Sequence, residues 1–133
     1  MSNPGTPLLP GASRPGMVTA IGVLTLISGI VNILAGLGIG GGLALSVVLL
    51  CVAPVGALPI VLGVFEILYA LKLLSDPPQP VQPNQTIAIL EIVCFLFGNA
   101  VAGITGVLAL VFYSDANVKA YFARLASLPQ VVA

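Results

Sequence analysis

Two glutamates stand inside long apolar runs of the chain, and their side chains have the clearest capacity for chemistry. Glu66 lies in the run 43–74 and Glu91 in the run 86–113. An ionised carboxylate in hydrocarbon costs about 3 kcal/mol or more, so such a group usually has a partner or a function. If the two runs form an antiparallel hairpin, both carboxyls reach a similar depth, where they can face each other and share a proton. The pair then predicts a proton or cation relay.

A structural role is the alternative for both glutamates. Each carboxyl can stay protonated, bond a hydroxyl such as that of Tyr69, and hold two helices together. Cys51 and Cys94 stand singly in apolar runs, where they are expected to be buried as small apolar side chains; a disulfide between them is the alternative.

Other chemistry has little support in the residues. Histidine is absent, which removes the commonest metal ligand and the usual general base. The chain also has no nucleophile with a base partner, no zinc-ligand spacing and no nucleotide-binding motif. We therefore expect no catalytic residue, no cofactor site and no metal site, and we expect that the protein is not an enzyme.

The composition is that of an integral membrane protein. Hydrophobic residues make up 59% of the chain and charged residues 6%, whereas soluble domains are about half apolar and a quarter charged. So few charges cannot cover a water-facing surface, which indicates that the lipid bilayer surrounds the protein. The net charge is zero, so nucleic acid is not an expected partner.

The apolar runs predict the membrane spans. The first span covers 17 to about 37 and ends in a glycine cluster, which favours a turn or a loosened backbone. The run 43–74 is too long for one upright span, and Pro54 and Pro59 interrupt it. We expect a connecting segment over 43–53 and a second span over 57–74; one long kinked helix is the alternative.

The run 86–113 fits either one tilted helix or two helices of about 14 residues with a turn at Gly98-Asn99. With four spans, all four basic residues fall on one side of the membrane, as the positive-inside rule favours. We therefore predict an all-α fold of four short transmembrane helices with both termini cytoplasmic; three spans with a long final helix is the alternative. Short helices are tolerated where the bilayer thins or where the turn packs against protein. The basic residues are Arg14, Lys72, Lys119 and Arg124.

Three regions follow from this division. Residues 1–16 are expected to be a disordered arm rich in proline and glycine. Together with the first span they form an uncleaved signal anchor, with a cleavable signal peptide as the alternative. Residues 17–114 form the transmembrane bundle. Residues 115–133 form a cytoplasmic tail whose apolar side chains recur at helical spacing, which predicts an amphipathic helix on the membrane surface.

Small residues form a packing seam at helical spacing. Glycines recur every seven residues along the first span, with an asparagine between them, and small residues recur every four along the last span. Such positions let helix backbones approach closely. We expect packing within the chain; an interface with another copy or another protein is the alternative. Asn32 and Asn99 fall toward the same outer side, where their side chains can bond. The seam consists of Gly22, Gly29, Asn32, Gly36, Gly98, Ala102 and Gly106.

Three stretches resemble a loose group of small bacterial membrane proteins of unknown function: RPGMVTAIGVL, VLGVFEILYALKLLSDPP and GVLALVFYSDANVKAYF. The resemblance implies four helices in the bacterial inner membrane and supplies no activity. The group pattern favours a Pro-Gly turn in the last hairpin, where this chain has Gly98-Asn99. The expected function is that of a non-catalytic accessory subunit or scaffold that packs against partner membrane proteins or its own copies. The alternative is a small proton- or cation-coupled transporter that uses Glu66 and Glu91.

Overall fold

The computed structural model describes residues 13–43, 53–96 and 98–128, without the side chains of 39–43 and 53–55. Within these ranges the secondary structure is five α-helices and no strand, so the all-α prediction is confirmed there. The helices are α1 (Gly16–Leu43), α2 (Ala53–Leu74), α3 (Gln85–Phe95), α4 (Ala100–Ser114) and α5 (Ala116–Ala126).

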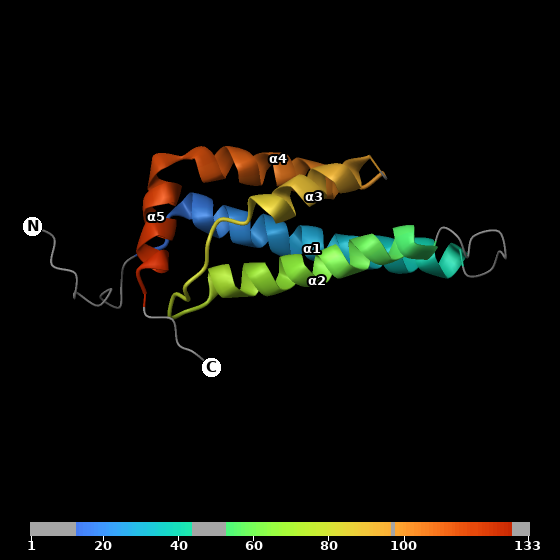
Figure 1. The fold of residues 1–133 in the computed structure, drawn as a ribbon, viewed down its shortest axis with the longest axis horizontal. Helices are drawn as coiled ribbons and strands as arrows, with labels where there is room; N and C mark the ends of the chain where they lie inside the picture. The colour runs from blue at the N-terminus through green and yellow to red at the C-terminus, as the bar shows by residue number, and fades with distance from the viewer. Residues whose placement is uncertain (1–12, 44–52, 97, 129–133) are drawn as a thin grey trace, which may run out of the picture.

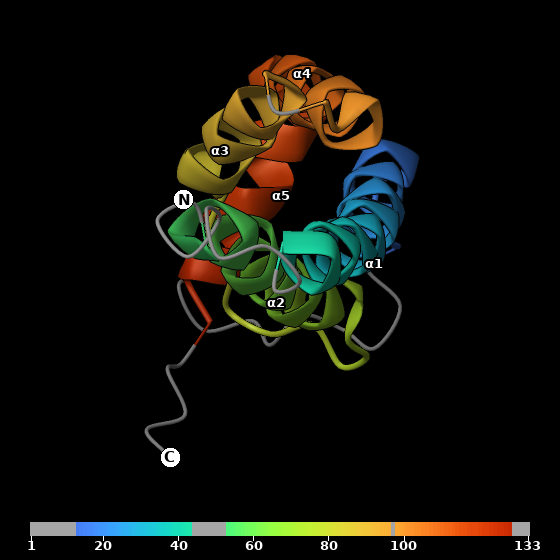
Figure 2. The same ribbon diagram turned by 90° about the vertical axis from the view of Figure 1, so that its right-hand side faces the viewer.

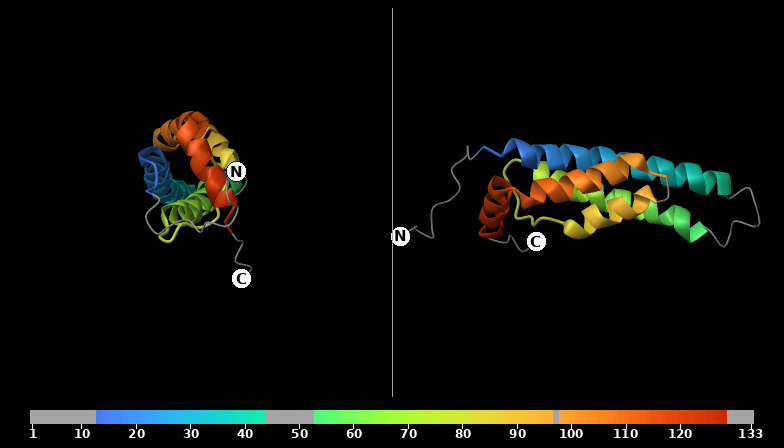
Figure 3. Two further views of the ribbon diagram at one scale, coloured as in Figure 1. Left: turned by 90° about the vertical axis from the view of Figure 1, so that its left-hand side faces the viewer. Right: turned by 90° about the horizontal axis from the view of Figure 1, so that it is seen from above.

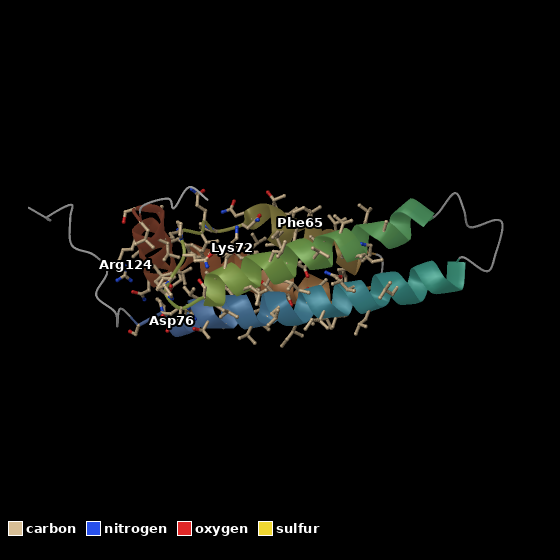
Figure 4. All side chains as sticks on the ribbon, turned by 90° about the horizontal axis from the view of Figure 1, so that it is seen from below. Phe65, Lys72, Asp76 and Arg124 are labelled. Atoms are coloured by element: carbon tan, nitrogen blue, oxygen red, sulfur yellow. The ribbon has the colours of Figure 1, made fainter. Side chains whose placement is uncertain are left out.

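Helices α1 to α4 run alternately in opposite directions around a common axis (Figures 1 and 2). They form two antiparallel hairpins, α1–α2 and α3–α4. The start of α1, the end of α2, the start of α3 and the end of α4 all lie at one end of the bundle, and α5 crosses it there. We call this the basic end, because basic residues lie there. The Arg14 guanidinium donates to the Ser75 carbonyl at this end, at 2.7 Å. Lys72 and Arg124 also lie there (Figure 4).

The two hairpins differ in length. Segments Gly16–Gly38 and Gly56–Leu74 are each long and apolar enough to cross a membrane. Helices α3 and α4 have 11 and 15 residues, which correspond to about 16 and 22 Å. Figure 3 shows the α3–α4 tip ending before the far end of the α1–α2 hairpin. In the described residues the candidate spans number two, or three if α4 and α5, bent by 82°, count as one.

Two boundaries differ from the prediction. Helix α1 continues through the glycine cluster to Leu43, where the sequence analysis favoured a turn or a loosened backbone. Helix α2 begins at Ala53 and contains Pro59, so its start is four residues earlier than predicted. Glycine costs a helix about 1 kcal/mol relative to alanine in water, but in an apolar environment any other backbone conformation leaves polar groups unpaired. The predicted link over 43–53 lies mostly outside the described residues.

The predicted division of 86–113 into two helices is confirmed, and side chains of asparagine begin both of them. The Asn84 side chain accepts from the Ile87 N–H at 3.1 Å and begins α3. The Asn99 side chain accepts from the Ala102 N–H at 3.1 Å and begins α4. Gly98, between the helices, has a φ of +90°, a conformation that glycine adopts without strain. Four membrane spans stay a prediction, because α3 and α4 are short.

The interior of the bundle contains polar side chains among its apolar core, and the outer surface is apolar. Six polar side chains are buried, whereas large apolar side chains along α1 to α4 are exposed. Soluble monomers rarely expose an apolar surface of this extent, so the distribution fits a protein surrounded by lipid. The buried polar residues are Thr25, Ser28, Asn32, Glu66, Glu91 and Thr105.

Helix α5 closes the basic end of the bundle. The Asp115 carboxylate accepts from the Asn117 and Val118 N–H groups, which caps the helix. Its apolar side chains are buried, and the Phe122 ring packs edge-on against Tyr113 at 5.8 Å between ring centres. The predicted amphipathic helix is present, and its apolar face packs on the bundle. The buried side chains of α5 are Val118, Tyr121, Phe122 and Leu125.

Candidate functional site

Glu66 is held by a side chain of the neighbouring helix. Its side chain is 0% exposed in the interior of the bundle. The Asn32 amide of α1 donates to both carboxyl oxygens, at 2.8 Å to Oε1 and 3.0 Å to Oε2. Hydrogen bonds to a carboxyl are among the stronger side-chain contacts, so this contact ties α1 to α2.

Asn99 extends the contact to the second hairpin. Its amide Nδ2 donates to Asn32 Oδ1 at 2.5 Å, while its own Oδ1 caps α4. Asn99, Asn32 and Glu66 therefore form a chain of hydrogen bonds across three helices. The side-chain bond between Asn32 and Asn99 that the sequence analysis considered is present. We call these three residues the asparagine relay.

Glu91 is equally buried but is not held. Its side chain is 0% exposed, and among the described residues neither carboxyl oxygen has a hydrogen-bond partner. The Ser28 hydroxyl is also fully buried without a partner in the described part of the chain. This hydroxyl lies near both Glu66 and Glu91, so a small side-chain rotation would bring it to either carboxyl.

Glycines bring the helices close at both glutamates. A Cβ built on Gly29 of α1 would lie 3.1 Å from the Glu66 Cβ, and one on Gly106 of α4 would lie 3.0 Å from the Glu91 Cβ. Both distances are shorter than ordinary carbon contacts of about 3.5–4.0 Å. A side chain at either glycine would push the glutamate-bearing helix away. These two glycines therefore allow α1 to lie close to α2 at Glu66, and α4 to lie close to α3 at Glu91.

The two carboxyls do not share a hydrogen bond. The sequence analysis expected them to face each other or to bond a hydroxyl such as that of Tyr69. Instead Glu66 accepts from Asn32, Glu91 has no partner among the described residues, and the Tyr69 and Tyr113 hydroxyls bond each other at 2.9 Å. The reason is geometric. Helix α2 packs mainly on α1 and α3 mainly on α4, so α2 and α3 contact each other little.

The other seam residues divide by their contacts. Gly22 and Gly36 lie against Leu74 and Ile60 of α2, where any Cβ would overlap those side chains. Ala102 is fully buried in α4. Gly98 does not belong to the seam, because a Cβ there would meet nothing within 4 Å; the turn requires glycine for its positive φ.

Four interior residues were not singled out as site residues by the sequence analysis. They are Thr25, Ser28, Gly63 and Thr105. Thr25, Ser28 and Asn32 stand at i, i+3 and i+7, which places them on one face of a helix. That spacing was readable from the sequence and marks the polar side of α1. Gly63 packs its backbone against Gly29, and a lone glycine in an apolar run carries no such signal.

Cys94 is buried as a free thiol; Cys51 lies outside the described residues. The described residues contain no group of three or more acidic or thiol side chains able to hold a metal ion. The interior therefore offers two carboxyls, one fixed and one not, and hydroxyls beside them. Such a set can bind a proton or a single small cation.

No family model, curated protein or solved structure matches the chain.

Proposed function

We propose that this chain is a non-catalytic integral membrane protein that carries protons or monovalent cations, with Glu91 as the group that binds and releases them. The observation that best supports the proposal is the buried Glu91 carboxyl, which has no hydrogen-bond partner in the described residues. An ionised carboxylate cannot stay in such a place alone, so it must carry a proton or hold a cation. When the proton or cation leaves, the negative charge that stays on Glu91 favours binding of another.

Glu66 has the supporting role in this proposal. Its carboxyl is held by Asn32, which Asn99 holds in turn. A group that is bonded at both oxygens is a poor exchange site, because any change of its charge disturbs three helices. Its negative charge, when present, lies near Glu91 and would favour a bound cation or proton there.

The ligand class follows from the oxygen atoms available. Glu91 and Ser28 supply three side-chain oxygens without partners among the described residues. Calcium requires six to eight oxygens and magnesium a near-ideal octahedron. A proton needs only one carboxyl oxygen, so it is the ligand that these groups fit best; a sodium ion would need further oxygens, from the backbone or from water.

The packing seam gives little support to a partner-binding function. Gly22, Gly29 and Gly36 face α2, and Gly106 faces α3, so these glycines are used within the chain. They do not form an open surface for another helix.

An accessory or scaffold role is the second candidate, and the α3–α4 tip favours it. Asn99 bonds Asn32, which lies about 24 Å along α1 from Gly16 and inside the apolar segment Gly16–Gly38. Gly98 at this tip is exposed. Turns at membrane depth occur where protein covers them, so a second copy or a partner protein would shield the tip.

The proposed location is the bacterial inner membrane with the basic end in the cytoplasm. Support comes from the gathering of Arg14, Lys72 and the basic helix α5 at that end, which is the arrangement that the positive-inside rule favours.

Flux through proteoliposomes tests the first proposal. Wild-type protein is reconstituted with an internal pH-sensitive dye, and a potassium diffusion potential drives cation entry, with sodium or choline as the external salt. We expect acidification for a proton carrier, or sodium-dependent dye response for a sodium–proton exchanger. Glu91→Gln should lower the flux at least tenfold, because glutamine cannot exchange a proton.

Glu66→Gln is the matched control. It removes the same charge at a similar depth but keeps an oxygen that can accept from Asn32, so more than half of the flux should remain. Wild-type liposomes that conduct no more than empty ones would overturn the proposal, as would equal losses in the two variants. Crosslinking of Ala100→Cys to a second copy or to another protein, with no flux in any variant, would favour the accessory role.

A further inference from the structure

Lys72 stands beside an open hollow at the basic end. It lies in the last turn of α2, is exposed, and forms no ion pair with any described residue. The hollow has a volume of about 550 Å³ and lies between α2, the proline-rich loop and the start of α3. Asn84 and Gln82 line it beside Lys72, so its mouth is polar, and Phe65 lies at its inner end.

A second, apolar hollow continues from Phe65 between α2 and α3. It has a volume of about 200 Å³, and α2 residues from Leu58 to Phe65 face α3 residues from Leu90 to Cys94 across it. Figure 4 shows Lys72 at the basic end of α2 and Phe65 further along the same helix. Phe65 lines both hollows, so they are neighbours, and we call the two together the α2–α3 groove.

The dimensions of the groove match one phospholipid molecule. Lys72 and Leu58 are separated by about 21 Å along the helix axis at 1.5 Å per residue. One leaflet with its headgroups is about 20–22 Å thick. The apolar hollow extends over about 10 Å of helix, and the side chains that line it are apolar, which suits a hydrocarbon chain.

We propose that the α2–α3 groove binds one anionic phospholipid, with its phosphate at Lys72 and one acyl chain over Phe65 between α2 and α3. An ammonium group at the headgroup level attracts phosphate, and Asn84 and Gln82 can donate to headgroup oxygens. The acyl chain occupies a strip where α2 and α3 do not pack together, so lipid completes the contact between the two hairpins.

The natural absence of tryptophan allows a direct test with a single reporter. Phe65→Trp places the reporter in the groove, and Val111→Trp places one on the exposed face of α4 as the matched control. Each full-length variant is reconstituted in phosphatidylcholine vesicles that contain increasing fractions of dibrominated phosphatidylglycerol or dibrominated phosphatidylcholine. Bromine quenches tryptophan on contact, so the quenching curves give the relative affinity of each lipid at each site.

We expect the groove reporter to prefer phosphatidylglycerol by about fivefold, the ratio that corresponds to about 1 kcal/mol for one lysine near a lipid surface. The Val111→Trp reporter should show no preference. Adding Lys72→Gln to Phe65→Trp should abolish the preference, Lys72→Arg should keep most of it, and Lys119→Gln, on α5, should leave it unchanged. Circular dichroism of each variant checks that the helices are retained.

Three results would overturn the proposal. Equal preference at the two reporters would indicate general surface attraction, as would an effect of Lys119→Gln as large as that of Lys72→Gln. A groove reporter that neither lipid quenches would mean that a second copy or a partner protein covers the groove.

Discussion

The two hairpins place a glutamate at the centre of the bundle but surround it differently. In the α1–α2 hairpin, Glu66 accepts two hydrogen bonds from Asn32, which in turn accepts one from Asn99. In the α3–α4 hairpin, Glu91 is buried to the same extent and has no partner among the described residues. The same residue type therefore has a structural role in one hairpin and an available carboxyl in the other.

The difference shows how burial and function can be separated. A buried polar group with all its bonds made rigidifies the fold, whereas one with bonds missing lowers stability. Proteins keep such a cost mainly where the group acts. The Glu91 carboxyl is therefore expected to lower the stability of the fold, whereas the Glu66 carboxyl is expected to raise it. Substitutions at the two positions should change the free energy of unfolding in opposite directions.

Asn32→Leu should give the largest effect on stability. The change removes the donor to Glu66 and the acceptor of the Asn99 amide at once. The buried Glu66 carboxyl is left without a hydrogen bond, and the half-buried Asn99 side chain keeps only its bond to the Ala102 N–H. We expect a loss of about 2–3 kcal/mol in the free energy of unfolding, measured by the loss of helical circular dichroism on titrating dodecyl sulfate into mild-detergent micelles.

Asn117→Leu is the matched control, because Asn117 is exposed on α5 and its change should cost less than about 0.5 kcal/mol. Equal effects of the two leucine substitutions would mean that the asparagine relay contributes nothing to the stability of the bundle.

The turn at Gly98-Asn99 was predicted because its signal is local. Glycine adopts a positive φ without strain, and a short polar side chain can accept the first free N–H groups of the helix that follows. Both depend on a few neighbouring residues only. The two glutamates were singled out because a charge inside an apolar run is rare in any fold.

Features that depend on distant contacts were not predicted. The glycine cluster is helical up to Leu43, because the surroundings of the backbone outweigh the local preference of glycine for a turn. The separate surroundings of Glu66 and Glu91 arise because each packs on its own hairpin partner, and helix spacing within one run cannot reveal which face meets which neighbour. The apolar face of α5 was assigned to lipid because lipid and the end of a bundle favour the same pattern.

Gly29→Ala should give the second largest effect and tests whether the tight hairpin is needed to hold Glu66. The added Cβ would lie 2.8 Å from the Gly63 carbonyl oxygen and 3.1 Å from the Glu66 Cβ. Separation of α1 from α2 would lengthen the Asn32–Glu66 bonds, with an expected loss of about 1–2 kcal/mol.

Gly38→Ala, in the same helix, is the control for that substitution. A Cβ there would meet nothing within 4 Å, so alanine should be neutral or stabilising by up to about 1 kcal/mol. A stabilisation by Gly29→Ala equal to that by Gly38→Ala, in the same dodecyl sulfate titration, would show that helix propensity and not close packing controls this hairpin.

Substitution of Glu91 should change stability the least, and whether it raises or lowers stability is the most informative result. Glu91→Met removes a buried carboxyl that has no bond to lose, so the variant should be more stable than the wild type by about 1 kcal/mol. Glu66→Met, with a side chain of the same size, strands the Asn32 amide and should be less stable by about 1–2 kcal/mol. Both are measured by dodecyl sulfate titration.

A loss of stability for Glu91→Met equal to that for Glu66→Met would assign the two glutamates the same structural role and would remove the reason for choosing Glu91 as the exchanging group. A gain in stability together with a loss of flux would show that the fold retains this carboxyl at an energetic cost because its proton or cation is used.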